Sequence, residues 1–178
     1  MITKQRKLSA SLSNRVATRR NYYGLYQVFH RGGMIDSAVG DGILVYFDQA
    51  RDTCAPAVKA AQELIGRLEA VNRQRAERTQ PPILVGIGVH AGSVLVANVG
   101  DKRRMVHTVV GEAALVAQAL QDVASGGEIL VSSEVAASAG DGIVLENGPV
   151  VSVKGRAQPV EAFRVAFEVQ PILEETRP

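Results

Sequence analysis

The chain has 178 residues, of which 46% are hydrophobic and 21% are charged, a length and composition that predict one globular domain with a substantial core. Aromatic residues make up only 4%, so Val, Leu, Ile and Ala must fill that core. The single cysteine, Cys54, excludes an intrachain disulfide and a zinc site built mainly on thiolates. The N-terminus lacks the apolar core of a signal peptide, which predicts a cytoplasmic protein.

The net charge is +2, and it is distributed unevenly along the chain. Seven basic residues precede Asp36, the first acidic residue, and the remainder carries 13 Lys and Arg against 18 Asp and Glu. A basic arm on a mildly acidic body suits a polyanion such as nucleic acid or a membrane surface. Basic terminal runs are more often solvated helix faces, so neither partner is expected, and polyanion binding stays as an alternative function.

The N-terminal segment, residues 1–31, is predicted to be basic and helical. Leu8, Leu12 and Val16 begin an apolar stripe at helical spacing, and a glycine pair would end the helix. Over residues 34–47 two apolar runs flank a glycine-rich turn, a pattern that predicts a β-hairpin.

Residues 55–77 carry apolar side chains at spacings of three and four with charged side chains between them, which is typical of an amphipathic helix. The most apolar stretch, residues 83–100, is long enough to suggest a membrane-spanning helix, but its many glycines suit a helix poorly. Two buried strands at 83–89 and 93–99, joined by a His-Ala-Gly turn, explain it better.

The rest of the chain continues to alternate helices and strands. It reads as a charged loop at 101–104, a short helix at 112–123, a strand at 128–132, a helical turn at 133–139, and strands at 150–153 and 160–167. Strands that alternate with helices and return as hairpins predict an α/β (α+β) fold with a mixed, mostly antiparallel sheet.

Three segments in fixed order carry recognisable motifs. They are Gly40-Asp41-Gly42 with the strand to Phe47; Val85 to Val94 with Asn98-Val99-Gly100 and Thr108-Val109-Val110-Gly111-Glu112; and Gly126 to Ser132 with Val153-Lys154-Gly155-Arg156. Each segment alone is a weak signal. Together, from about Gly32 to Val165, they are similar to the catalytic-type domain of class III adenylate and guanylate cyclases.

The resemblance implies a ferredoxin-like βαββαβ core that works as a head-to-tail dimer with active sites at the interface. The cyclase homology domain would span residues 32–168, after a basic segment (1–31) that is the remnant of its first helix and before a frayed tail (169–178). On this alignment the family's first strand is missing, which would leave unpaired backbone groups in the centre of the sheet. We expect residues 1–7 or a second chain to fill that gap.

Cyclisation of a nucleoside triphosphate needs two divalent ions, which activate the attacking 3′-hydroxyl and neutralise the triphosphate. The family holds both ions with two aspartates, of which Asp41 matches the one in the Gly-Asp-Gly turn, and nothing matches the one on the first strand. A single carboxylate would hold Mg²⁺ or Mn²⁺ only weakly. Without the family, Asp41 is a turn aspartate favoured for its local hydrogen bonds, and both interpretations stay open.

The residues that would recognise a nucleotide are largely changed. Adenine-specific members have a Lys and an Asp at the positions of Ser37 and Val106; Ser37 can still form a hydrogen bond, whereas Val106 cannot. Lys154 matches a family Lys that contacts the triphosphate, although an exposed turn lysine is the more ordinary interpretation. His90 matches a histidine that the family commonly has for structural reasons.

The helix at 112–123 has lost the residues that act on the transition state. The family's Val-Asn-x-Ala-x-Arg pattern reads Ala114-Leu115-Val116-Ala117-Gln118-Ala119 here. Leu115 replaces the Asn that orients the ribose, and Ala119 replaces the Arg that meets charge on the phosphate. Loss of such a preorganised partner costs about 10²–10³ in rate, so no catalytic residue is predicted.

These losses predict an adenylate/guanylate cyclase-like domain of cyclic-nucleotide signalling that is catalytically inactive. It would act by forming a homodimer or heterodimer with a cyclase-type domain, or by binding ATP or GTP weakly. One alternative is an active class III cyclase, producing 3′,5′-cyclic nucleotide with a partner subunit, although the chain has neither complementary half of the site complete. The other is the polyanion-binding module.

Overall fold

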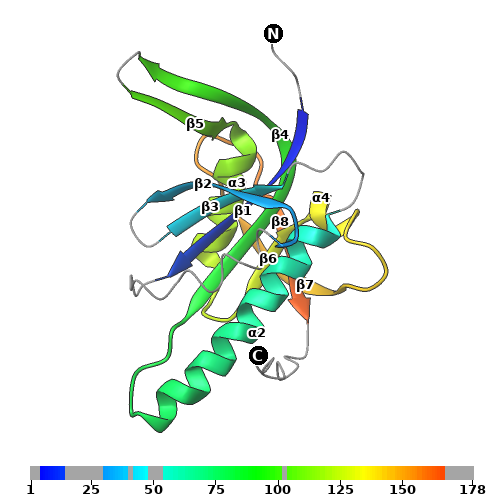
Figure 1. Ribbon diagram of the computed structural model, residues 1–178. Helices are drawn as coiled ribbons and strands as arrows, with labels where there is room; N and C mark the ends of the chain where they lie inside the picture. Colours follow the sequence, from blue (N-terminus) through cyan, green and yellow to red (C-terminus); the bar gives the residue numbers. More distant parts are fainter. Residues whose placement is uncertain (1–4, 15–29, 40–41, 48–53, 102–103, 167–178) are drawn as a thin grey trace.

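The structure, a computed structural model, describes residues 5–14, 30–39, 42–47, 54–101 and 104–166 (Figure 1). The strands are β1 (Gln5–Asn14), β2 (Gly33–Val39), β3 (Gly42–Phe47), β4 (Val85–Asp101), β5 (Arg104–Val110), β6 (Ile129–Ser132), β7 (Val144–Val151) and β8 (Val160–Ala166). The helices are α2 (Ala55–Glu77), α3 (Glu112–Val123) and α4 (Ser133–Ala136).

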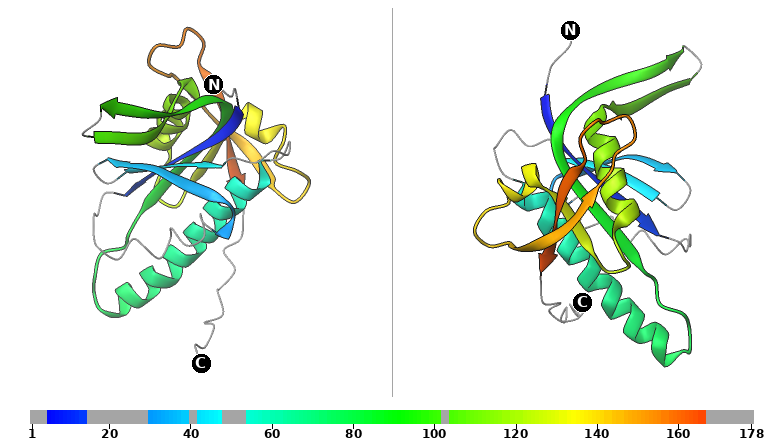
Figure 2. Two further views of the ribbon diagram at one scale, coloured as in Figure 1. Left: turned by 45° about the horizontal axis from the view of Figure 1, so that its top comes forward. Right: turned by 180° about the vertical axis from the view of Figure 1, so that it is seen from behind.

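The strands form one mixed sheet in the order β2-β3-β1-β4-β6-β8-β7, and β5 pairs with β4 beside this path. β4 and β6 run parallel, whereas the other paired strands run antiparallel. α2 packs on one face of the sheet and α3 on the opposite face (Figures 1 and 2). The predicted fold class, α+β with a mixed, mostly antiparallel sheet, is confirmed.

The strand that was expected to be missing is present as β1. It lies between β3 and β4, paired from Leu8 opposite Phe47 to Ser13 opposite Gly42 on one side, and along its whole length with β4 on the other. The predicted helical segment over residues 1–31 is therefore wrong for 5–14, and the sheet includes residues before 32. Residues 15–29 lie outside the described part.

The error at β1 arose because a spacing of four fits two structures. Leu8 and Leu12 lie on one side of a helix, but they also share one face of a strand, whose side chains alternate with period two. The segment Leu-Ser-Ala-Ser-Leu-Ser alternates strictly, which is the signal that favours a strand. Because β1 is paired on both sides, it leaves no gap between β3 and β4. Residues 1–7 had been expected to fill such a gap, and Gln5 to Lys7 are the first three residues of this strand.

β4 is one continuous strand of 17 residues, where two strands and a turn had been expected. Its first part pairs with β1, and from Leu95 to Asp101 it pairs with β5, a strand that the sequence pattern did not indicate. The chain passes straight through His90 because each half of β4 has its own partner. The β4–β5 hairpin consequently projects from the rest of the sheet (Figure 1). β7 also begins earlier than expected, at Val144.

The helices over 55–77 and 112–123 and the hairpin of β2 and β3 are confirmed. α2 has proline in its first turn and buries a stripe of side chains that ends at Gly66. Its exposed C-terminal half is braced by Asn72, whose Nδ2 donates to the Ile83 carbonyl at 2.8 Å and whose Oδ1 accepts the Ile83 N–H at 2.7 Å. None of the helices in the described part is long and apolar enough to cross a membrane.

The sheet separates two hydrophobic clusters. Ile129 and Val131 face α2, whereas Leu130 between them packs with Val116 and Leu120 of α3. All five side chains are fully buried, and burial of each contributes about 1.5–3 kcal/mol to stability. The alternation along β6 shows how one short apolar strand serves both clusters.

α3 lies directly on β4, and glycines make this approach possible. A Cβ at Gly88 would lie 2.2 Å from the carbonyl oxygen of Ala117, and a Cβ at Gly86 would lie 2.7 Å from the carbonyl oxygen of Ala124. Glycines that interrupt the apolar stretch in the sequence therefore mark close packing of a helix on a strand.

Candidate nucleotide-binding site

The two positions expected to read the base lie on different strands, Ser37 on β2 and Val106 on β5. β2 pairs with β3 and β5 pairs with β4, but Asp36 connects the two strands. Thr108 Oγ1 donates to Asp36 Oδ2 at 3.1 Å, and the Val109 N–H donates to Asp36 Oδ1 at 2.5 Å. Asp36 thus brings the strands that carry both base positions together.

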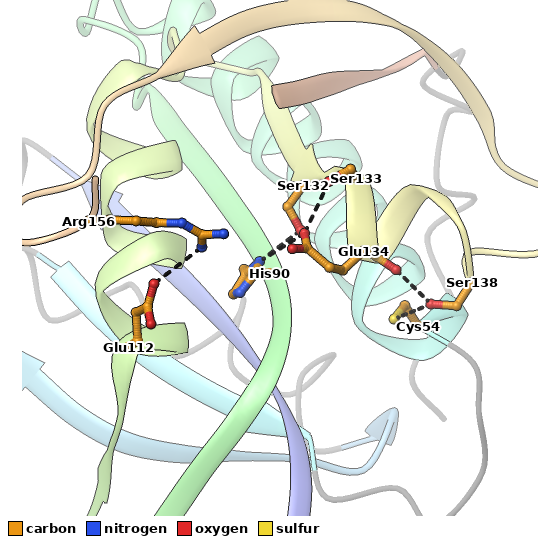
Figure 3. Close-up of polar contacts among 8 residues, drawn as sticks. All are labelled: Cys54, His90, Glu112, Ser132, Ser133, Glu134, Ser138 and Arg156. Atoms are coloured by element: carbon orange, nitrogen blue, oxygen red, sulfur yellow. Dashed lines mark hydrogen bonds and ion pairs between the residues drawn. The ribbon is translucent and has the colours of Figure 1, made fainter. Parts of the chain in front are cut away.

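Lys154 is exposed in the turn that connects β7 to β8. The Arg156 N–H donates to the Val153 carbonyl at 3.1 Å, and Gly155 has a φ of 85°, a conformation that favours glycine. The Arg156 guanidinium forms an ion pair with Glu112 in the first turn of α3, Nη1 to Oε1 3.3 Å (Figure 3). Because both side chains are solvent-accessible, this pair contributes at most about 1 kcal/mol, and its main effect is to hold the turn near α3.

Both connections converge on one segment, residues 108–112, which we call the β5–α3 junction. Asp36 reaches it at Thr108, and Arg156 reaches it at Glu112. Ser37 lies on β2 at one end of the sheet order, and Lys154 lies in the turn between β7 and β8 at the other end. Each is nevertheless next to or near a residue that contacts this junction. The junction is therefore the candidate nucleotide site.

The surface of α3 offers no positive charge to a triphosphate. Leu115 is 52% exposed, and Ala119 packs against the cluster that contains Leu120. The helix sequence has no Lys or Arg, and its charged residues, Glu112 and Asp122, are acidic. The negative charge of a phosphate at this helix would have to be neutralised by a residue of another element. The turn with Lys154 approaches α3 through the ion pair of Arg156 with Glu112.

The predicted metal residue Asp41 lies outside the described residues. Gly42, which follows it in the sequence, is opposite Ser13 in the register of β1 and β3, and the next residue of β1 is Asn14. β1 carries no Asp or Glu. The sequence pattern did not single out Asn14, because it did not indicate the strand that carries it. In the described part of the chain, no group of three or more His, Cys, Asp or Glu is arranged to hold a metal ion.

His90 is 5% exposed, and a polar chain leads from it to α4 (Figure 3). Its Nδ1 lies 2.8 Å from Ser132 Oγ and 3.6 Å from Glu134 Oε2. The Ser133 hydroxyl donates to the same carboxylate oxygen of Glu134 at 3.3 Å, so this oxygen is held from its own helical turn. These polar contacts support the structural role expected for His90.

α4 is also tied to the start of α2. Cys54 Sγ lies 2.8 Å from Ser138 Oγ, and the Ser138 hydroxyl donates to the Glu134 carbonyl at 3.1 Å (Figure 3). Burial raises the pKa of the Cys54 thiol, although its hydrogen bond with Ser138 opposes the shift. Cys54 is therefore held as a protonated, structural thiol at neutral pH.

His90 and Glu134 both have shifted pKa values. Burial lowers the pKa of His90, Glu134 opposes this shift without reversing it, Arg156 adds to it and Glu112 opposes it. Burial raises the pKa of Glu134, but hydrogen bonds to its carboxylate and the nearby His90 outweigh burial and lower it. Both shifts favour the folded state at neutral pH over acid.

We expect the free energy of unfolding to fall by roughly 1 kcal/mol between pH 7 and pH 5, because unfolded His90 takes up a proton near its ordinary pKa and folded His90 takes one up only at lower pH. Glu134 loses its contribution only below about pH 4.5, so this window isolates the histidine. Urea unfolding at three pH values would measure the slope. His90→Gln should flatten it, and an equally steep variant would contradict the assignment.

Comparisons with known proteins agree with these motifs. A family model described as the adenylate and guanylate cyclase catalytic domain matches residues 34–166. The adenylate cyclase of Anabaena cylindrica is 36% identical over 110 residues, which are 58% of this chain and 22% of that protein. Adenylate cyclase 1 of Rhizobium meliloti (strain 1021) is 26% identical over 164 residues, 88% of this chain and 25% of that protein. The chain thus spans a quarter or less of the length of these relatives.

Solved structures share the fold over nearly the whole chain. The crystal structure of the guanylyl cyclase Cya2 matches with a TM-score of 0.81 and 27% identity, covering 93% of each chain. The adenylyl cyclase CyaB from P. aeruginosa matches with a TM-score of 0.79 and 24% identity, covering 94% of this chain and 97% of that one. Because the family model runs from β2 through β8, the chain belongs to the family of adenylate and guanylate cyclase catalytic domains.

Proposed function

We propose that this chain is a cyclase homology domain that forms no cyclic nucleotide by itself. It acts in cyclic-nucleotide signalling in the cytoplasm, through dimerisation and weak binding of ATP or GTP. The observation that carries the proposal is α3, where Leu115 and Ala119 occupy the positions of an Asn and an Arg in the family's motif. Neither side chain can orient a ribose or meet charge that develops on a phosphate, and loss of one such donor costs about 10²–10³ in rate.

The metal half of the site supports the same proposal. β1 supplies Asn14 where its register approaches Gly42, so Asp41 is the one carboxylate that these two segments, 5–14 and 40–42, contribute. An asparagine carbonyl can join a metal site but brings no charge. Mg²⁺ or Mn²⁺ would then be held weakly and mainly through the phosphates of a bound nucleotide.

Weak nucleotide binding is supported by two residues on the elements that contact the β5–α3 junction. Ser37 offers one hydrogen bond to a base, and Lys154 offers one positive charge to a triphosphate. Val106 on the other base strand offers neither. Contacts this sparse suit a low-affinity site with little discrimination between bases.

Exposed apolar side chains on and beside the projecting β4–β5 hairpin support dimerisation. Leu95 is 42% exposed and Val110 is 51% exposed, and they are directly opposite each other in the two strands. Leu115 on α3 is also more than half exposed. A homodimer or a heterodimer with another cyclase-type domain would remove these side chains from water.

The alternative of an active cyclase needs a partner subunit that supplies the missing groups. The polyanion-binding alternative is less favoured by β1, because Arg6 and Lys7 belong to a strand in the middle of the sheet rather than to a free arm. Salt-sensitive binding to DNA or to anionic vesicles would support that alternative.

The test is a cyclase assay of the purified chain with ATP and with GTP, each with Mg²⁺ and with Mn²⁺, alongside thermal shift and light scattering. We expect no cyclic product, a small nucleotide-dependent rise in melting temperature that Asp41→Ala reduces when metal is present, and a dimeric mass. Product that Asp41→Ala abolishes would overturn the proposal in favour of an active enzyme. Absence of any nucleotide-dependent shift would restrict the function to dimerisation.

A further inference from the structure

Asp36 occupies an irregular position in β2. The register with β3 pairs Ile35 with Val45 and Ser37 with Leu44, so Asp36 is an extra residue between two successive pairs. A bulge of this kind bends the strand and re-aims the side chain of the extra residue. At this bulge the carboxylate of Asp36 reaches across to β5.

The two hydrogen bonds of Asp36 connect strands that no described ladder joins. Val109 is paired with Val96 of β4, and its N–H donates to Asp36 Oδ1 at 2.5 Å. The Thr108 hydroxyl donates to the second oxygen, Oδ2, at 3.1 Å. A carboxylate that accepts two bonds through separate oxygens fixes both the distance and the orientation between the strands.

We propose that Asp36 is a positioning residue for base recognition, which holds β2 and β5 at the separation at which a purine fits between Ser37 and β5. The proposal rests on the proposed function, that the chain binds ATP or GTP. Ser37 directly follows Asp36, so any movement of the bulge moves Ser37 as well. A hydrogen bond to a base weakens steeply beyond about 3.2 Å, so opening the strands by 1 Å or so would lose it.

Asp36 should affect the affinity that comes from the base and leave the affinity that comes from the phosphates unchanged. The turn with Lys154 is held to the junction by Arg156 and Glu112, which do not depend on Asp36. A ligand without a base, inorganic tripolyphosphate, therefore reports on the phosphate contacts alone. The ratio of ATP or GTP affinity to tripolyphosphate affinity isolates the base.

The experiment measures ATP, GTP and tripolyphosphate binding, with Mg²⁺, by calorimetry for the unmodified chain, Asp36→Ala, Asp36→Asn and Thr108→Val. Asp141→Ala, at an exposed aspartate in the loop before β7, is the matched control. We expect Asp36→Ala to weaken the binding of ATP and of GTP about tenfold, the effect of one lost hydrogen bond, with the binding of tripolyphosphate unchanged. Thr108→Val keeps only the Val109 bond and should fall between Asp36→Ala and the unmodified chain. Asp36→Asn should stay closer to the unmodified chain, because its Oδ1 can accept the Val109 N–H and its Nδ2 can donate to the Thr108 hydroxyl.

Amide hydrogen exchange of Val109 provides an independent readout, because Asp36→Ala removes the acceptor of that N–H. Faster exchange together with an unchanged ratio of nucleotide to tripolyphosphate affinity would overturn the positioning role and leave a purely structural bond. Equal weakening of all three ligands would also overturn it. If the unmodified chain binds tripolyphosphate and nucleotide equally well, it has no base recognition, and this inference alone is refuted. If the unmodified chain binds neither ligand, the proposed nucleotide site is refuted as well.

Discussion

Replacing Gly88 by alanine should lower the free energy of unfolding by about 3 kcal/mol, at the upper end of the usual cost of overpacking. The added Cβ would lie 2.2 Å from the carbonyl oxygen of Ala117 and 2.5 Å from the backbone nitrogen of Gln121. Both atoms belong to the backbone of α3, so no side-chain rotation relieves the overlap, and the helix must move away from β4. That movement also disturbs the cluster around Leu120, which is fully buried.

Urea unfolding of Gly88→Ala measures this effect, and thermal unfolding should show a fall of roughly 6–12 °C for a domain of this size. Gly142→Ala is the control, because a Cβ there meets nothing within 4 Å and its backbone is compatible with alanine. We expect the control to change stability by less than about 0.5 kcal/mol. Equal stability of the two variants would mean that α3 does not rest on β4 at Gly88.

Elements with one strong periodicity were predictable from the sequence. α2 and α3 each bury one stripe of side chains at spacings of three and four, and both were predicted with the observed bounds. The hairpin of β2 and β3 was predictable because its turn carries glycines between two apolar runs. In these segments local pattern and tertiary packing favour the same structure.

β1 and β4 show where a local pattern is insufficient. Leu8 and Leu12 fit a helix and a strand equally well, and what decides is the pairing of β1 with two neighbours. β4 continues through its glycines because β1 and β5 satisfy its backbone hydrogen bonds in turn and α3 needs the space at Gly88. These causes are tertiary, and a window of the sequence does not contain them.

The candidate site divides in the same way. Ser37, Lys154 and Asp41 were identified by their places in linear motifs, and their roles stay predictions. From the sequence, Asp36 was notable only as the first acidic residue of the chain, because its importance depends on contacts with β5. Asn14 depends on the register of a strand that the sequence pattern concealed.

Asn14→Asp is expected to tighten Mn²⁺ binding about tenfold. Divalent ions of this class are usually held by one or two carboxylates together with phosphates and water, so a second carboxylate converts a weak site into an ordinary one. The prediction rests on the pairing of Ser13, which directly precedes Asn14 in the sequence, with Gly42, which directly follows Asp41. Titration with Mn²⁺, followed by electron paramagnetic resonance with and without ATP, measures the affinity.

A double-mutant cycle tests whether the two residues share one ion. If they do, Asn14→Asp in an Asp41→Asn background should raise the Mn²⁺ affinity much less than tenfold, because that double variant offers a single carboxylate. An undiminished gain in affinity would show that the new aspartate binds Mn²⁺ elsewhere. Even with both carboxylates, the chain should form no cyclic nucleotide, because Leu115 and Ala119 still leave the transition state without its partners. Tight metal binding without product would show that restoring the metal ligand is not sufficient and that the residues lost from α3 are also needed. Cyclic nucleotide formed by Asn14→Asp alone would instead show that weak metal binding was the main deficiency.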